Sequence, residues 1–182
     1  MVLYDPKNYI GEFVSDIHGE SESYALAYAE LISSAYGMPC TAGKISEYLH
    51  GSIFSENKKS SATTISPYVM LSSIKKSISE NKALIVLHSH PPYGTYPIRA
   101  RKKTGRIKGA RFSEQDWRFI KSVVEVYGKL TKSILIVPCP ICFAVFDKES
   151  YQAVSWNNGS YADFTFPDAS QIWNPHFLKE VN

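Results

Sequence analysis

The sequence predicts a mixed α/β fold in which a β-sheet is sandwiched by helices. Three observations point to it: an apolar strand candidate at residues 83–87, amphipathic helix candidates on either side of it, and further apolar strand candidates after the second of these helices. At 182 residues, the chain suits one domain spanning residues 1–182.

In the first half of the chain, residues 9–17 alternate roughly between apolar and polar side chains and predict a short strand. Residues 24–36 predict a helix, because serines and acidic residues precede them, apolar side chains fall near one helical face, and Gly37 and Pro39 follow. Residues 45–54 are mixed in pattern and are assigned as a strand.

Around the central strand, Pro67 opens a helix at residues 68–79, where proline suits the first turn. Ser113 is the expected N-cap of a helix that runs to about residue 127, with an apolar stripe on one face. Strands are then expected at 134–137, 141–146 and 151–156. The tail from about residue 157 is rich in Asn, Gly, Pro and aromatic residues and is expected to be irregular.

Composition narrows the class of protein. Apolar residues make up 44% and charged residues 20% of the chain, as in a globular domain. The three cysteines, Cys40, Cys139 and Cys142, are too few and odd in number for a disulfide scaffold. No apolar run reaches the roughly 20 residues of a membrane span, and the first residues lack the features of a signal peptide. We therefore expect a cytoplasmic protein, or an effector secreted without a signal peptide, with no membrane partner.

Two histidines give the strongest chemical signal. His88 and His90 end the apolar strand, and Pro91 stops it. Residues i and i+2 of a strand point to the same face, so both imidazoles can reach one metal ion. Asp116 supplies a carboxylate as third ligand. Two imidazoles, one carboxylate and an open fourth position are typical of a catalytic site for Zn²⁺.

The segments His88-Ser89-His90-Pro91 and Ser113-Glu114-Gln115-Asp116 resemble the signature of the JAMM (MPN-type) metalloprotease family, which is an upstream Glu, His-x-His-Pro and Ser-x-x-Asp. The resemblance implies an MPN/JAMM-like (cytidine-deaminase-like) fold and a zinc-dependent hydrolase that cleaves a peptide or isopeptide bond. Twenty-five residues separate His90 from Asp116, against about ten in many members. We interpret residues 92–111 as an insertion, which a loop tolerates because closure entropy rises slowly with length.

The family also implies a general base, a glutamate that is not a metal ligand and that comes from a strand before the histidines. Glu47 is the first choice, because it opens an apolar segment similar to the family's Glu-bearing strand. Glu12 and then Glu30 are the alternatives. The resemblance gives Ser113 a second role beside capping, in which its hydroxyl stabilises the oxyanion of the reaction.

The insertion carries a concentrated positive charge. Seven Lys/Arg and no acidic residue lie between Arg99 and Arg111, which leaves 13 basic against 17 acidic residues elsewhere in the chain. Three interpretations stay open: a solvated loop, a lid over the substrate, or a patch for an acidic partner or nucleic acid. The candidate substrate-binding residues in the insertion are Tyr93, Tyr96, Arg101, Lys102 and Lys103.

Two biological settings fit a JAMM-type peptidase. One is an enzyme that trims a protein or peptide substrate, including one tagged with a ubiquitin-like protein. The other is a toxin, whose partner would be an immunity protein: Tyr4-Asp5-Pro6 followed by Gly11 and Phe13 is similar to the end of a bacterial Rhs-type repeat, and JAMM-like domains of polymorphic toxins carry longer loops. The alternative functions are a non-catalytic MPN-type binding module and a nucleic-acid-associated protein that uses the basic loop.

Overall fold

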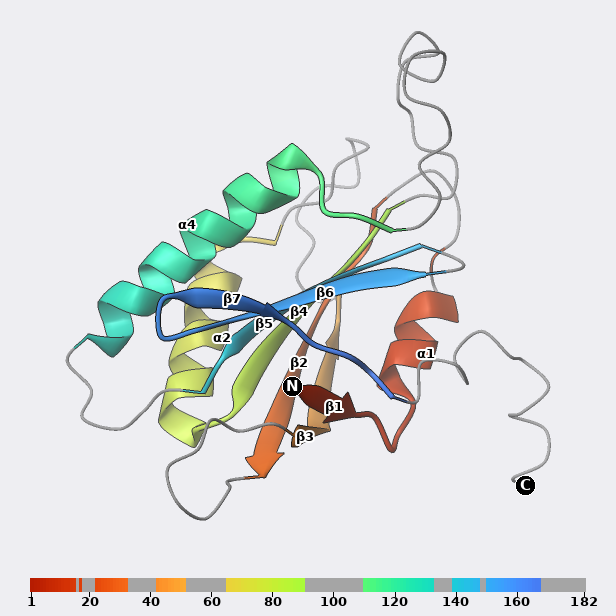
Figure 1. Ribbon diagram of the computed structural model, residues 1–182, viewed down its shortest axis with the longest axis horizontal. Helices are drawn as coiled ribbons and strands as arrows, with labels where there is room; N and C mark the ends of the chain where they lie inside the picture. Colours follow the sequence, from red (N-terminus) through yellow and green to blue (C-terminus); the bar gives the residue numbers. More distant parts are fainter. Residues whose placement is uncertain are drawn as a thin grey trace, which may run out of the picture.

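The computed structural model describes residues 1–15, 17, 22–32, 42–51, 65–90, 110–132, 139–147 and 150–167. The strands and helices are labelled in Figure 1. In chain order they are β1 (Val2–Tyr4), α1 (Tyr9–Ser15), β2 (Tyr24–Ile32), β3 (Ala42–His50), α2 (Pro67–Glu80), β4 (Ala83–Ser89), α4 (Glu114–Thr131), β5 (Ile141–Phe146), β6 (Tyr151–Asn157) and β7 (Ser160–Asp163).

The strands form one mixed sheet in the order β1-β3-β2-β4-β5-β6-β7. The pairs β1/β3 and β4/β5 are parallel and the other neighbours are antiparallel. The sheet curls so far that its two ends meet: Thr165, just after β7, forms a bridge to Val2 in β1. Thr165 accepts a hydrogen bond of 2.9 Å from the Leu3 N–H and donates one of 3.1 Å to the Met1 carbonyl. The first and last strands are thereby joined through one short segment.

Helices cover both faces of the sheet (Figure 1). On one face, α1 packs Ile10 and Phe13 into a core with small side chains of β2 and with residues of β4 and β5. On the other face, α2 and α4 contribute Ile74 and Ile120 to a second core. The expected mixed α/β fold with helices on both sides of the sheet is confirmed, and β4 lies at its centre, buried along its whole length.

The predicted helix at residues 24–36 is wrong over its described part, which is strand β2. Its composition favours helix, with Ala, Leu and Glu prominent. Its side chains nevertheless alternate in size: Tyr24, Leu26 and Tyr28 pack against the α2/α4 core, whereas the alanines at 25, 27 and 29 pack on the α1 side. Burial on both faces between β3 and β4 overrides the intrinsic helix propensity.

The predicted strand at residues 9–17 is also wrong, because residues 9–15 form helix α1. The Asp5 carboxylate starts this helix by accepting hydrogen bonds from the N–H groups of Tyr9 (3.0 Å) and Ile10 (2.6 Å). Ile10 and Phe13 are three residues apart and so lie on the same buried helical face.

Six of the other described elements agree with expectation, whereas strands β1 and β7 were not predicted. Strands β3, β4, β5 and β6 and helices α2 and α4 lie where the sequence predicts them, within a few residues at their ends. The described part of the tail, up to residue 167, is more ordered than expected, since it forms β7 and buries Phe164 and Phe166. The expected strand at 134–137 lies outside the described residues. Among the helices of the described ranges, none has the length and apolar character needed to cross a bilayer.

Candidate metal centre

The two predicted histidines lie side by side where β4 ends. His88 is almost fully buried, with 5% of its surface exposed, and faces the side of the sheet covered by α4. The His90 ring packs edge-on against it, with ring centroids 4.7 Å apart. The His90 N–H donates a 2.9 Å hydrogen bond to the Phe146 carbonyl, which ties the end of β4 to β5. The pair is therefore held by the rigid centre of the sheet.

Asp116 reaches this pair from the first turn of α4. The helix starts with a capping box, in which the Ser113 hydroxyl accepts a bond from the Asp116 N–H (3.2 Å) and the Asp116 carboxylate accepts one from the Ser113 N–H (2.6 Å). Asp116 Oδ1 lies 3.3 Å from His88 Nδ1, and its Oδ2 lies 3.2 Å from His90 Nε2. The structure thus brings together His88, His90 and Asp116, the three predicted metal ligands, and confirms Ser113 as the N-cap.

The charge state of Asp116 suits a ligand. Burial raises its pKa, but hydrogen bonding to His90, the nearby His88 and the bonds with Ser113 outweigh burial and hold the pKa at about 2. Asp116 is therefore a carboxylate at neutral pH.

A second carboxylate, that of Glu22, was missed by the sequence analysis. Glu22 precedes β2, and its Oε2 lies 3.5 Å from His88 Nε2. One donor atom each from Glu22, His88 and His90 lie within 4.8 Å of one another. The mistaken helix at 24–36 hid this residue, because Glu22 was interpreted as one of the acidic residues that precede a helix. The signal that would have found it is the size alternation of β2, which makes residue 22 the entry to a strand.

The separations between carboxylate oxygens and imidazole nitrogens are 3.2, 3.3 and 3.5 Å. Two of them involve different nitrogens of His88, Nδ1 toward Asp116 and Nε2 toward Glu22, and one imidazole binds a given ion through a single nitrogen. One donor atom each from Glu22, His88 and His90 lies close enough to the others that this group could hold a metal ion.

The His88 side chain supports the same conclusion. Its Nε2 atom is buried and has no hydrogen-bond partner among the described residues. A buried polar atom without a partner is costly, which makes such atoms rare in folded proteins. A hydrogen bond or an ion at this atom, which faces Glu22 and not Asp116, would remove the cost.

The structure does not bring Glu47 to this group, which corrects its assignment as general base. Glu47 lies opposite Tyr28 in β2, and Tyr28 lies opposite Leu84, four residues before His88 in β4. At about 3.3 Å per residue, Glu47 is displaced from His88 by roughly 13 Å along the sheet. A bulge at Ser46 contributes to the placement, because it turns Ile45 and Glu47 to opposite faces.

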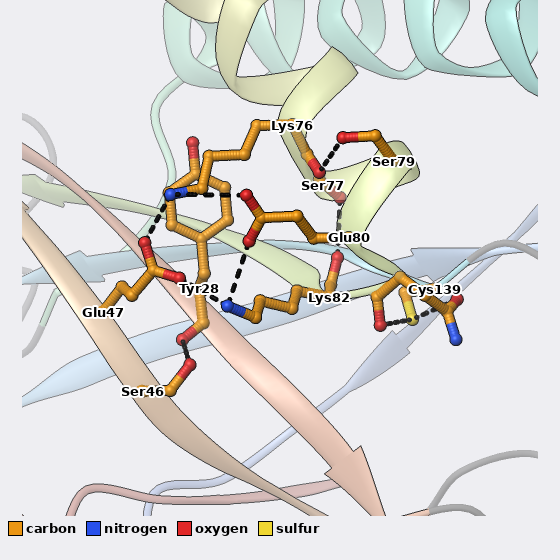
Figure 2. A network of polar contacts seen from close by, with 10 residues as sticks. Tyr28, Ser46, Glu47, Lys76, Ser77, Ser79, Glu80, Lys82 and Cys139 are labelled. Atoms are coloured by element: carbon orange, nitrogen blue, oxygen red, sulfur yellow. Dashed lines mark hydrogen bonds and ion pairs between the residues drawn. The ribbon is translucent and has the colours of Figure 1, made fainter.

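Figure 2 shows what Glu47 does instead. Its carboxylate pairs with Lys76 of α2 and with Lys82, which follows α2, and both lysines also pair with Glu80. Hydrogen bonds from Lys76 and Lys82 lower the pKa of Glu47. The Lys76 ammonium also lies 4.8 Å from the centroid of the Tyr28 ring. These four charges link β3 to α2, and we call them the α2 charge network.

The other two candidate bases lie elsewhere. Glu12 is exposed on α1, across the sheet from the histidines. Glu30 is exposed near the far end of β2, opposite Lys44. Among Glu12, Glu22, Glu30 and Glu47, Glu22 is the one that lies beside His88.

The insertion residues Tyr93, Tyr96, Arg101, Lys102 and Lys103 lie outside the described residues. The end of the insertion is described and is anchored to β6 and the turn before it. The Ala110 N–H donates to the Ser150 hydroxyl (2.6 Å), and the Phe112 N–H donates to Gln152 Oε1 (3.0 Å). These bonds fix the approach to Ser113 and thus to Asp116.

A small hollow borders the site between the sheet and α4. His88 and Asp116 supply its polar wall, and the rest is mainly apolar, including Val86, Phe119 and Phe143. Apolar surroundings strengthen electrostatic interactions between groups at the site.

Comparisons with known proteins show resemblance at the level of structure. No protein-family model and no protein of curated function matches the chain. Among solved structures, it is similar to the solution structure of protein DSY2949 from Desulfitobacterium hafniense, with 10% sequence identity and a TM-score of 0.49 over 91% of this chain and 92% of the other.

Proposed function

We propose that the chain is a zinc-dependent hydrolase of the JAMM type, on an MPN-like fold, that cleaves a peptide or isopeptide bond. The observation that carries the proposal is the convergence of two carboxylates, from the starts of β2 and α4, on the histidine pair at the end of β4. Two imidazoles with carboxylates on both sides can provide metal ligands and a separate proton acceptor.

His88, His90 and Asp116 would hold the ion, which requires His88 to present to the ion the nitrogen that faces Asp116. When bound, Zn²⁺ polarises the substrate carbonyl and lowers the pKa of water. The protein supplies the rest: β4 fixes the two imidazoles, and the capping box of α4 fixes Asp116. The three ligands come from elements that tertiary packing holds rigidly, as a preorganised site requires.

Glu22 takes the place of Glu47 as general base. Its carboxylate accepts a proton from the attacking water as the new C–O bond forms at the carbonyl carbon. It then delivers this proton to the departing nitrogen as the C–N bond breaks, so that Glu22 ends the cycle as a carboxylate. Its place beside His88 supports this role, because the water has to lie next to the metal ligands.

Ser113 would act on the developing oxyanion. Its hydroxyl oxygen accepts a bond from the Asp116 N–H, and its own proton is left to donate. A hydroxyl donor placed where negative charge develops stabilises the transition state.

Metal analysis of the purified chain tests the ligand set. We expect about one zinc per chain, lost in His88→Ala and in Asp116→Ala. Glu22→Gln should retain zinc with an affinity within a few-fold of wild type. The reverse result, with zinc lost in Glu22→Gln and kept in Asp116→Asn, would make Glu22 the third ligand and Asp116 the residue that orients His88.

Activity separates Glu22 from Glu47. Both Glu22→Gln and Glu47→Gln replace a carboxylate by an isosteric amide, and only Glu22→Gln should abolish cleavage. Newly formed amino termini and isopeptide products in a cell lysate treated with wild type or His88→Ala would identify the bonds that are cut. A zinc-free, folded wild type without products would favour the non-catalytic binding module.

For the biological setting, we propose a toxin or effector that acts on a host protein, and an enzyme acting on proteins tagged with a ubiquitin-like protein is the alternative. Support comes from the Rhs-like segment Tyr4-Asp5-Pro6 and from the insertion at residues 92–111. Growth arrest on expression of wild type, absent with Glu22→Gln, would support the toxin. Salt-sensitive nucleic-acid binding that is lost on neutralising Arg101, Lys102 and Lys103 would instead favour the nucleic-acid-associated protein.

A further inference from the structure

Tyr24 stacks flat on His88. The ring centroids are 4.5 Å apart and the ring planes differ by 4°. The two residues are direct partners across the β2/β4 pair. The Ser89 N–H bonds to the Ser23 carbonyl at the adjacent pair, which makes Tyr24 and His88 a non-hydrogen-bonded pair, where facing side chains lie closest together. The stack is therefore set by the register of the central strands.

The orientation of the His88 ring matters because its two nitrogens face different groups. Nδ1 faces Asp116 at 3.3 Å and Nε2 faces Glu22 at 3.5 Å. The χ2 torsion of histidine has broad minima, so the side chain itself holds the ring plane only weakly. A ring turned out of this plane would aim neither nitrogen at its carboxylate. Some neighbour has to fix the plane.

His90 does not fix it alone, because it meets the His88 ring edge-on at an interplanar angle of 89°. Tyr24 covers the flat face of the ring. Both Tyr24 and His88 also line the hollow beside the site.

We propose that Tyr24 is a positioning residue for the metal centre, which fixes the plane of His88 by stacking and so aims both nitrogens at their partners. The proposal rests on the proposed function, since it assumes that His88 is a metal ligand. The active feature is the flat aromatic ring and not the hydroxyl. Groups that orient a ligating histidine typically change metal affinity by about 10–100-fold when removed.

Three variants of the full chain separate this role from a merely structural one: Tyr24→Phe keeps the ring, Tyr24→Leu keeps an apolar cross-strand side chain without a flat face, and Tyr24→Ala removes both. Zinc affinity is measured by competition with a chromophoric chelator, and the visible spectrum of the Co²⁺-loaded protein reports the ligand geometry. We expect affinity within about threefold of wild type for Phe, and a loss of roughly 10–100-fold with an altered Co²⁺ spectrum for Leu and Ala.

Each outcome decides the matter. If Leu binds zinc as Phe does, Tyr24 only fills space and the proposal is overturned; if Phe loses as much as Ala, the hydroxyl is the active group and the proposal is again overturned. Thermal unfolding of the metal-free variants shows whether Ala folds, and Leu carries the test if it does not. A wild type that binds no zinc overturns the proposed function and this proposal together, whereas a zinc-binding wild type with unchanged Leu and Ala variants overturns this proposal alone.

Discussion

The backbone N–H of Ser23 donates a 2.9 Å hydrogen bond to the hydroxyl of Ser89, and the Ser89 N–H donates one of 2.9 Å to the Ser23 carbonyl. Ser89 is fully buried between the two histidines of the motif, and Ser23 directly follows Glu22. These two bonds tie the entry of β2 to the end of β4. They fix where Glu22 lies relative to the histidine pair.

Replacing Ser89 by alanine should weaken this tie. The Ser23 N–H loses its acceptor, which costs about 1 kcal/mol of folding free energy. Because Glu22 is then less well placed, we expect turnover to fall roughly tenfold or more, with zinc affinity nearly unchanged. Urea unfolding, zinc competition and cleavage rates check the three parts. Ser79→Ala, which removes an exposed hydroxyl bonded to the Lys76 carbonyl, is the control and should change none of them.

Gly51 should not tolerate a side chain. A Cβ at this position would lie 1.7 Å from the Tyr24 carbonyl oxygen, so Gly51→Ala must displace the start of β2. We expect a loss of about 1–3 kcal/mol in stability and reduced zinc affinity. Gly128→Ala is the matched control: its Cβ would meet nothing closer than Trp156 at 3.8 Å, and alanine favours helix α4 by about 0.5–1 kcal/mol. Equal stability of the two variants would contradict the close approach.

The N-cap of α4 offers a graded test. Ser113→Ala removes the acceptor of the Asp116 N–H and should cost about 1 kcal/mol of stability. It should also lower zinc affinity, because the capping box holds Asp116 toward the histidines. Ser113→Thr retains a hydroxyl and should restore most of both properties. Thermal unfolding and zinc competition on the two variants measure these effects, and a threonine variant as weak as alanine would argue against capping as the cause.

The α2 charge network predicts a pH dependence. The pKa of Glu47 is lowered from its ordinary value near 4.5, so the native state stabilises its carboxylate. This stabilisation is fully present above the ordinary value and is lost as the pH falls through the lowered one. Because Glu47 is about one-third exposed, its contribution is about 0.5–1 kcal/mol.

Glu47→Gln tests this dependence. It should be less stable than wild type at pH 7, and the difference should shrink in urea unfolding at pH 3.5 and below. A stability difference that does not change with pH would exclude the charge of Glu47 as its origin.

Removing the metal should lower stability without unfolding the chain, because two apolar cores lie on either side of the sheet. Free zinc at a hundredfold excess over its dissociation constant should raise the unfolding free energy by about 2.7 kcal/mol. Thermal scans with zinc and with a chelator measure the shift. His88→Ala should show none, and a shift of equal size in that variant would place the zinc elsewhere.

The site residues that depend on local sequence patterns were predicted correctly. His88 and His90 follow from a short strand pattern, and Ser113 with Asp116 follows from a capping box only four residues long. Both features depend on near neighbours, which a sequence displays directly. The structure accordingly brings these residues together as expected.

The missed residues depend on pairing between distant strands. Glu22 acquires its place only when β2 docks against β4, more than 60 residues later in the chain. The Ala- and Leu-rich composition of β2 favours a helix locally, and only burial between two strands reverses it. Glu47 was misplaced for a related reason, because neither the bulge at Ser46 nor the lysines on and just after α2 can be recognised in its own segment.

The bridge between Val2 and Thr165 joins residues 163 positions apart in the chain. Contacts between residues so far apart in the chain form slowly, because the entropy of closing a large loop is lost before the contacts stabilise the structure. We expect the pairing between β1 and Thr165 to form last during folding, after the β5-β6-β7 meander and the central strands have assembled. An edge that pairs late stays open longer to strands of another molecule, which favours strand exchange at β1. The order of folding, and not only the final packing, therefore affects whether the chain remains a monomer.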